Sequence, residues 1–361
     1  MTPSSAVSST VFSASSTSAP ATSSAASSSA VEHGDQLPEG LVDLAVIGGG
    51  AAGLSSALML ARSRRSVVVL DAGAPRNAPA EGIHALLGNE GTPPAQYLER
   101  GRAEVRQYGG WVVPAEVVAA RGAAPAADGD LRFEIVLADG RRLTSRRLVV
   151  AVGIRDELPE IPGLAAHWGR GLVHCPFCHG WEVRDQAIGV IATRPASFHQ
   201  ALMFRAVTED LTMFTQGLEV DAETRERCEA LGITILEAPI EEIVAGPDGG
   251  VAGVRLAGGE LVPRTVLAAA TVMTPRLDGL DELGLTLEEI PAGMGQKITT
   301  AMAGSTDVPG VWAVGNSADP SAQVGAAAAG GALAGGHIHG TLLMVDAEAA
   351  VATHRAAPRV A

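Results

Sequence analysis

The chain has 361 residues, a formal net charge of −14 and a sequence pI near 5.1. This length is enough for two domains with substantial cores, and the acidic balance excludes the large basic face that a nucleic-acid partner would need. Three cysteines over this length favour a reducing, intracellular setting over a disulfide-stapled secreted fold, so we expect a cytoplasmic protein.

The N-terminal segment, residues 1–40, differs in composition from the rest of the chain. It is dominated by Ser, Ala and Thr, and it contains neither Lys nor Arg. A segment of this kind cannot bury a core, so its composition predicts a disordered tail. A secretory signal would need a basic start and an apolar run, and a transit peptide would need Arg, so neither is predicted.

The first cofactor signal follows this tail. An apolar run at residues 44–47 predicts a buried strand, and Gly48-Gly49-Gly50-Ala51-Ala52-Gly53 opens a helical pattern directly after it. In this G-x-G-x-x-G motif the first glycine allows a tight turn, the second lets the backbone approach a pyrophosphate, and the third lets helix and strand pack closely. A second strand, residues 66–70, ends at Asp71, which is placed to accept hydrogen bonds from ribose hydroxyls. The order of these elements predicts a dinucleotide site.

Cys175 and Cys178 form a Cys-x-x-Cys pair that is followed by His179. Two residues between cysteines suit a reversible redox switch, in which one thiol attacks and the other resolves. A four-cysteine zinc site would need a second pair, and only Cys228 remains, within a charged helical pattern that predicts core packing. No metal site is therefore predicted, although a zinc site that includes His174 or His179 is the alternative.

A second strand-and-turn pattern lacks the glycines of the first. Residues 187–191 predict a strand, and Ala192-Thr193-Arg194-Pro195-Ala196-Ser197 follows it. Aligned with G-x-G-x-x-G, the three glycine places are taken by Ala192, Arg194 and Ser197. Arg194 would block a close backbone approach, and Pro195 removes a donor N–H. The next strand, residues 211–214, leads into Thr215-Gln216-Gly217, which contains no arginine pair to clamp a phosphate.

The C-terminal third supplies the last predicted elements. Residues 144–153 and 310–316 each predict an apolar strand that ends in a glycine turn. Residues 323–336 predict a helix whose small side chains could let it approach a flat ring closely. The charge-free run from 320 to 345 is long enough to span a bilayer, but it is rich in Ala and Gly and is interrupted by polar residues, so it predicts a packed helix and no membrane contact. The interrupting residues are Gln323, His337 and His339.

Together these motifs resemble the low-molecular-weight thioredoxin reductase family over residues 41–345. The resemblance implies an α/β fold with two Rossmann-like three-layer dinucleotide-binding domains, the second inserted into the first. The implied segments are a tail at 1–40, the FAD domain at 41–154 and 270–345, an inserted, degenerate NADPH-type domain with the cysteines at 155–269, and a tail at 346–361. It also implies a homodimer, in which His337 and His339 either reach the partner's active site or merely end a helix.

The resemblance also implies which residues hold FAD. For the pyrophosphate and the adenosine ribose these are Gly48, Gly50, Ala51, Ala52, Gly53 and Asp71. Arg76 and Asn77 follow as further contacts, and Val117, in a strand-like stretch at 115–118, would meet the adenine. The ribityl–phosphate region and the isoalloxazine ring would meet Gly315, Asn316, Gln323 and Val324. The reductases usually carry Asp where this chain has Asn316, so the charge of that contact is absent here.

The missing second motif favours one subgroup of that family. The FAD-dependent dithiol oxidases of holomycin- and gliotoxin-type natural products share the Cys-x-x-Cys-His pattern and lack NADPH motifs, and residues 174–182 resemble them. The resemblance implies an antibiotic-biosynthesis enzyme that closes an intramolecular disulfide in a small-molecule dithiol. Electrons would pass through Cys175 and Cys178 to FAD and then to O2, giving H2O2. Cys175 would be the interchange thiol and Cys178 the flavin-proximal one.

His179 is suited to act as the base for the substrate thiol or to hold Cys178 as a thiolate, because its unperturbed pKa lies near neutral pH. His174 and Glu182 could orient it. Two other functions stay open. One is a disulfide reductase that takes electrons from NADPH, with Arg194 meeting a phosphate in an altered mode, or from another donor. The other is a non-catalytic flavin-binding protein.

Overall fold

A computed structural model describes residues 36–124 and 129–356. The predicted tail at 1–40 therefore lies outside the described residues, except for residues 36–40. The chain is organised around four sheets, of which the two largest are built from parallel strands at their centres.

The largest sheet has seven strands and carries the first glycine motif. At its centre β1 (Leu41–Ile47) runs parallel to β2 (Val67–Asp71) on one side and to β6 (Arg142–Val150) on the other. These strands are buried over most of their length, which is why they read as continuous apolar runs. The remaining strands are β3 (Trp111–Pro114) beside β2, β5 (Arg132–Leu137) and β4 (Val117–Ala123) beyond β6, and β19 (Val311–Ala313) along the end of β6.

The strand that the sequence predicts at residues 115–118 starts two residues later in the structure. β4 begins only at Val117, and the two preceding residues turn the chain between β3 and β4. Their backbone groups bond to other parts of the sheet instead: Ala115 N–H donates to Asp71, and the carbonyl of Glu116 accepts from Ala138. Local residue type does not reveal these long-range partners.

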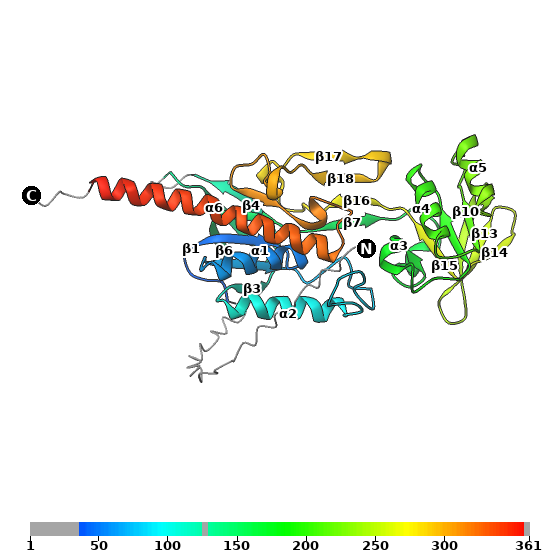
Figure 1. Ribbon diagram of the computed structural model, residues 1–361, viewed down its shortest axis with the longest axis horizontal. Helices are drawn as coiled ribbons and strands as arrows, with labels where there is room; N and C mark the ends of the chain where they lie inside the picture. Colours follow the sequence, from blue (N-terminus) through cyan, green and yellow to red (C-terminus); the bar gives the residue numbers. More distant parts are fainter. Residues whose placement is uncertain (1–35, 125–128, 357–361) are drawn as a thin grey trace, which may run out of the picture.

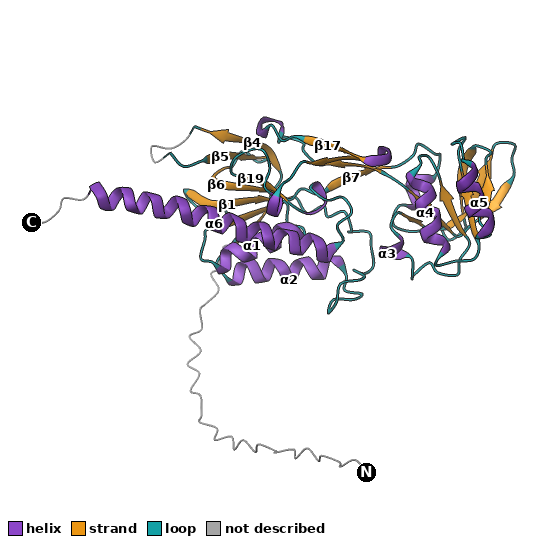
Figure 2. Cartoon of the chain, turned by 45° about the horizontal axis from the view of Figure 1, so that its top comes forward, coloured by secondary structure: helices purple, strands orange, loops and turns teal. Residues whose placement is uncertain are grey.

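Three helices cover one face of this sheet, α1 (Ala51–Arg62), α2 (Pro94–Gln107) and α6 (Val324–Ala356), as Figure 2 shows. Helix α6 lies tightly on α1 because glycines face it. A Cβ on Gly331 would lie 2.0 Å from the carbonyl oxygen of Ala52, and one on Gly335 would lie 2.8 Å from Met59 Cβ. These two small residues of α6, which the sequence predicted to face a flat ring, therefore face α1.

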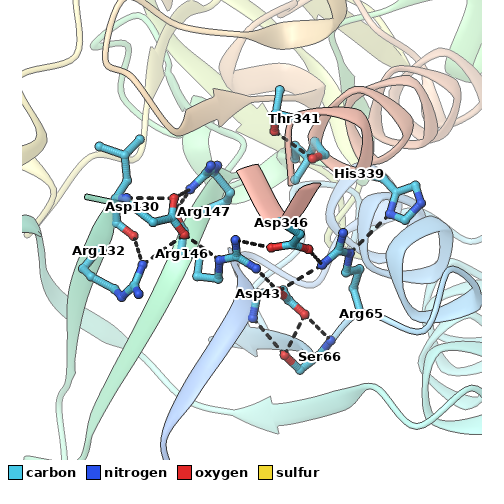
Figure 3. Close-up of polar contacts among 12 residues, drawn as sticks. Asp43, Arg65, Ser66, Asp130, Arg132, Arg146, Arg147, His339, Thr341 and Asp346 are labelled. Carbon is cyan, nitrogen blue, oxygen red and sulfur yellow. Dashed lines mark hydrogen bonds and ion pairs between the residues drawn. The ribbon is translucent and has the colours of Figure 1, made fainter. Parts of the chain in front are cut away.

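Helix α6 is longer than the sequence predicts, because it continues past residue 345 to Ala356, within the segment expected to be a tail. Ion pairs with the sheet hold this extension (Figure 3): Asp346 accepts from Arg65 at 2.6 Å and from Arg146 at 2.7 Å. Arg146 also pairs with Asp43 at 2.9 Å and with Asp130 at 2.6 Å. These partners are too distant in sequence to be predicted from local pattern. Among the described helices, none is long and apolar enough to cross a membrane.

The second body contains a five-stranded parallel sheet in the order β11 (Thr234–Leu236), β10 (Leu211–Phe214), β9 (Ile188–Ile191), β15 (Val266–Ala269) and β8 (Leu172–Val173). Its helices are α3 (Pro176–His179), α4 (Ala196–Arg205) and α5 (Ala222–Ala230), and an antiparallel unit is formed by β12 (Ile240–Ala245), β13 (Val251–Leu256) and β14 (Leu261–Pro263). We call this part the inserted body and the rest the main body. Figure 1 shows the inserted body at one end of the molecule.

The chain passes between the two bodies twice, through a pair of antiparallel strands. These are β7 (Ile154–Glu157) and β16 (Val272–Pro275), which form a four-stranded sheet with β18 (Gly295–Ile298) and β17 (Leu287–Ile290). The two parallel sheets and the return of the chain to the first confirm the predicted α/β class, with two Rossmann-like bodies, one inserted into the other.

Candidate active site

The turn after β1, residues 48–53, is called the first turn. Gly48 has φ +107°, and a Cβ there would lie 2.3 Å from the carbonyl oxygen of Ala151. A Cβ on Gly53 would lie 2.0 Å from the carbonyl oxygen of Gly48, so only glycine allows this strand and helix to approach so closely. A Cβ on Gly50 would meet no atom within 4 Å. The second glycine therefore faces open space, at the N-terminus of α1, where unpaired N–H groups favour a phosphate.

That space is part of a cavity of about 460 Å³. The structure brings together around it nearly all the predicted site residues, from both bodies. Those that line it are Gly48, Gly50, Ala51, Ala52, Asp71, Arg76, Asn77, Val117, Cys175, Cys178, His179, Gly315, Asn316, Gln323 and Val324. Gly53 lies behind the wall, in the contact between helix and strand. The open turn, the helix start and the length of this lining fit a dinucleotide such as FAD.

Two charged residues of the lining have protein partners that the sequence did not reveal. Asp71 accepts from Arg102 at 2.9 Å and from the backbone N–H of Gly73 at 3.0 Å, which fixes its carboxylate beside the first turn. Arg76 forms two bonds of 2.6 Å to Asp156 in β7, and Asp156 also accepts from Thr271 at 2.7 Å. The charge of Arg76 is therefore paired at the crossing between the bodies, and its role as an FAD contact stays a prediction.

The cysteine pair opens onto the same cavity from the inserted body. Cys175 precedes α3 and Cys178 lies within it, and their sulfur atoms are 2.7 Å apart. The hydrogen bond that Cys178 donates lowers the pKa of Cys175 to about 6, with further help from the backbone N–H groups at the start of α3. The same contact raises the pKa of Cys178, so the thiolate favoured in the reduced pair is Cys175.

Gln323 of the main body lines the cavity together with this pair. Its amide lowers the pKa of each thiol, as a smaller effect than the contact between the two sulfur atoms. Because an amide NH2 donates and a thiolate accepts, the amide favours the charged form of the cysteines. The sequence predicted that Gln323 meets the flavin ring. The structure adds that Gln323 shares the cavity with the thiols, and the flavin contact stays a prediction.

His179 lies beside the pair at the end of α3. Burial lowers the pKa of its imidazole, so it is neutral at neutral pH and able to accept a proton. In the reduced pair the hydrogen bond that Cys178 donates to Cys175 raises the pKa of Cys178, and the expectation that His179 holds Cys178 as a thiolate stays a prediction. Its Nδ1 is buried and has no hydrogen-bond partner in the part of the chain that the structure describes.

Both residues expected to orient His179 have other partners, and the charge of Glu182 also acts on the His179 imidazole, whose pKa it raises against the larger effect of burial. His174 donates from Nδ1 to the carbonyl of Ala269 at 3.1 Å, and a carboxylate oxygen of Glu182 lies 3.6 Å from Nε2 of His84. His84, whose Nδ1 is 2.7 Å from the Glu90 carboxylate, lines the cavity and was missed by the sequence analysis. It lies in a loop of the main body, outside any motif, so no sequence signal pointed to it.

The turn after β9, residues 192–197, is called the second turn. Its backbone starts as the first one does, with an N–H bond of 2.8 Å from Ala192 to Phe214. Beyond that point, Arg194 Nη1 donates at 2.8 Å to the carbonyl of Gly293, in a short 3₁₀ turn of the main body. Among the described residues that line the cavity, none comes from the second turn. The turn is therefore in contact with the other body.

The remaining candidates make contacts within their own chain. His337 Nδ1 accepts from the indole N–H of Trp312 at 3.1 Å, and His339 Nδ1 lies 3.4 Å from Arg65 Nε. Cys228 is 1% exposed, as a packing residue would be, and burial raises the pKa of its thiol. Among residues 36–124 and 129–356, no group of three or more His, Cys, Asp or Glu side chains is arranged to hold a metal ion.

Comparison with known proteins adds an independent line of evidence. A family model described as pyridine nucleotide-disulphide oxidoreductase matches residues 42–332. The thioredoxin reductase tcpT of Claviceps purpurea is 34% identical over 265 residues, which cover 70% of this chain and 80% of that protein. The thioredoxin reductase sirT of Leptosphaeria maculans is 33% identical over 331 residues, covering 85% and 96%. The crystal structure of HlmI matches with a TM-score of 0.81 at 40% identity and covers 89% of this chain and 98% of that one.

Proposed function

This chain belongs to the pyridine nucleotide-disulphide oxidoreductase family, whose thioredoxin-reductase-like members bind FAD, and on that premise we propose that it is an FAD-dependent dithiol oxidase. Its substrate is a small-molecule dithiol in which it closes an intramolecular disulfide. One observation carries the proposal: the cysteine pair opens onto the cavity of the first turn, whereas the second turn is in contact with the main body through Arg194. The shared cavity supports a path for electrons from the cysteines to FAD, and the side chain of Arg194 in the second turn argues against a second nucleotide there.

Bound FAD supplies the chemistry that accepts two electrons from the cysteine pair and delivers them to O2. The substrate dithiol loses two electrons and two protons in this scheme. O2 gains the two electrons and the two protons and leaves as H2O2. The residues expected to hold the cofactor are those of the first turn with Asp71, Asn77 and the segment from Gly315 to Val324. The proposal needs no metal ion and no nicotinamide.

The cysteines divide the disulfide exchange between them. A substrate thiolate attacks Cys175 Sγ in the oxidised pair, which breaks the Cys175–Cys178 bond and releases Cys178. The second substrate thiol then attacks the substrate sulfur bound to Cys175, which closes the product disulfide and releases Cys175. A leaving thiol departs faster when its pKa is low, so the pKa of about 6 for Cys175 supports this order.

His179 is placed to take the proton of the substrate thiol. Its imidazole lines the cavity beside both cysteines, and its lowered pKa keeps it neutral and basic near pH 7. His84 lies in the same lining and is a second candidate for a group that faces the substrate.

One anaerobic titration tests the direction of electron flow. The flavin absorbance of the holoenzyme is followed while NADPH and then a dithiol are added. We expect bleaching by the dithiol and none by NADPH. Rapid bleaching by NADPH would establish a disulfide reductase instead, which is the function in the names of the tcpT and sirT relatives. No bleaching by any dithiol would favour a non-catalytic flavin protein.

Two variants test the cysteine relay. Cys178→Ser should keep FAD and lose dithiol-dependent oxygen consumption, because the resolving thiol is removed. Cys228→Ala is the matched control, since Cys228 is buried in the core of the inserted body and does not line the cavity. Oxygen consumption that survives in Cys178→Ser at the level of the control would refute the relay.

We also propose that the enzyme is a cytoplasmic homodimer. Large apolar side chains of α1 and α6 are exposed on the single chain, at Met59, Leu333, Leu343 and Met344. Apolar surface of this kind supports an interface between copies. Light scattering should give the mass of two chains, and a monomeric mass would contradict the dimer.

The proposed cytoplasmic location rests on the small number of cysteines, and cell fractionation tests it.

A further inference from the structure

Asn316 makes three hydrogen bonds that no carboxylate could make. It lies in the 3₁₀ turn η5 (Gly315–Ser317), directly after β19. Its Nδ2 lies 3.1, 3.2 and 2.9 Å from the carbonyl oxygens of Asp319, Pro320 and Ala322, so its two N–H groups serve three acceptors and one of them is shared. Because all three partners are acceptors, the amide nitrogen must be the atom that faces them, which settles the orientation of the amide. Its Oδ1 stays available to accept a hydrogen bond.

These bonds shape the segment that leads into α6. Asp319 and Ala322 are also joined by a backbone bond of 3.0 Å, and Ser321 donates to the Asp319 carboxylate from both its N–H and its hydroxyl. Gln323 follows at once, and its carbonyl accepts from Ala327 at 2.9 Å as the helix begins. The backbone of Gln323 is thus fixed on one side by the helix and on the other by the turn that Asn316 closes.

An aspartate in this place would act in the opposite way. An ionised carboxylate only accepts hydrogen bonds, so it would set negative oxygen atoms against three carbonyl oxygens. The turn from Asp319 to Ala322 would lose its three side-chain bonds and would move away from residue 316. The departure from the Asp that the reductases usually carry is therefore part of the way this chain builds the turn.

We propose that Asn316 is a positioning residue, which closes the turn at residues 319–322 so that the Gln323 amide is held against the Cys175–Cys178 pair. Gln323 lines the cavity with both cysteines and lowers the pKa of each thiol, and Asn316 acts through it. The inference rests on the proposed function only in taking the cysteine pair as the reacting group. It applies to the reduced pair whichever way electrons flow.

The test measures the acidity of Cys175 directly. The reduced holoenzyme is alkylated with iodoacetamide across a pH series, and labelling at Cys175 is followed by mass spectrometry. Gln323→Leu and Asn316→Leu should each move the midpoint upward by about 0.5–1 pH unit, because each removes the amide donor from the thiolate. The double variant should move it no further than either single variant, because both changes remove the same contact.

The controls separate position from charge. Asn316→Asp keeps the shape of the side chain and should shift the midpoint at least as far as Asn316→Leu. Asn77→Asp adds the same charge to the cavity lining without touching the turn. If Asn316→Leu leaves the midpoint unchanged, or if Asn77→Asp reproduces the whole shift of Asn316→Asp, the positioning role is overturned. Should Asn316→Leu fail to fold, the isosteric Asn316→Asp decides that half of the test.

Gln323→Leu decides the other half, because it leaves the turn and its three bonds in place. An unchanged midpoint in that variant would overturn the proposal whatever Asn316 does. The outcome is independent of the NADPH titration, which reports only on the electron donor. Failure of the oxidase assignment and failure of the positioning role would therefore be seen in different measurements.

Discussion

The first turn and the second turn each join a buried parallel strand to a helix, and both begin with the same backbone bond. Gly48 N–H donates to Leu70 in the first, and Ala192 N–H donates to Phe214 in the second, both at 2.8 Å. After that point they differ. The first turn has no side chain larger than a methyl group and borders the cavity, whereas the second carries Arg194, whose guanidinium contacts Gly293.

The strands and helices around a nucleotide site can therefore be present in a domain whose turn no longer binds a phosphate. The strand order and the helix packing of the inserted body need buried apolar side chains, and β9 and β10 are buried throughout. A phosphate site needs something else, namely bare backbone at the helix start. Selection on the fold and selection on the site act on different residues, so one can be kept while the other is changed.

The largest effect is expected when the first turn receives the arginine that the second turn carries at the corresponding position. Gly50→Arg should lower the affinity for FAD by at least about 100-fold, because the side chain would occupy the open space where the pyrophosphate approaches. Fluorescence titration of the FAD-free chain measures this, with circular dichroism as the check on folding. Gly50→Ala is the control for folding, since a Cβ there meets no protein atom, and it should lower the affinity for FAD less than Gly50→Arg does. Undiminished FAD binding in Gly50→Arg would place the pyrophosphate elsewhere.

The second prediction concerns stability. Gly48→Ala should lower the free energy of unfolding by about 3 kcal/mol, because φ is +107° and the new Cβ would overlap the carbonyl of Ala151. The reciprocal change, Ala192→Gly, should cost only about 1 kcal/mol, through added freedom of the unfolded chain. Urea unfolding of the FAD-free chains, followed by circular dichroism, measures both. Equal costs would mean that the two turns share one conformation.

The third prediction concerns the pH dependence of Cys175 alkylation, at the place where the two bodies meet. The inserted body carries the cysteines, and the main body contributes Gln323 to their surroundings. Since the pKa of Cys175 is lowered to about 6, its alkylation rate in the reduced enzyme should rise with pH through about 6 and level off above it. An ordinary thiol would do so near about 8.5. Cys228, whose pKa is raised by burial, is the internal control. A midpoint near that of an ordinary thiol would contradict the thiolate assignment.

The sequence predicted well those elements whose residue pattern lies within one short, continuous stretch of the chain. The strand, glycine turn, helix and acid from 44 to 71 follow one another in the structure as expected, and β9 and β10 lie where their apolar runs are. The cysteine pair is also a local motif. Each of these depends on neighbours in the chain, whose pattern is visible without a structure.

The parts that could not be predicted depend on pairs that are distant in sequence. Helix α6 continues past residue 345 because Asp346 meets Arg65 and Arg146, which lie some 200 to 280 positions away. His84 reaches the cavity from a loop with no motif, and the Asn316 amide has a role only once the turn beside it is known. A pattern of residue types carries no information about such partners.

The smallest expected effect comes from undoing the second turn. Arg194→Gly removes a single exposed hydrogen bond between the bodies, worth about 0.5–1.5 kcal/mol, so dithiol turnover should fall by no more than about 10-fold. NADPH should still fail to bleach the flavin, because residues 215–217 contain no arginine to hold its 2′-phosphate. Arg225→Ala is the matched control, since that exposed arginine pairs with Glu237 inside the inserted body and reaches nothing in the main one. Bleaching by NADPH in Arg194→Gly alone would mean that the second turn is one side chain away from a working nucleotide site, and the contrast between the two turns would then rest on Arg194 by itself.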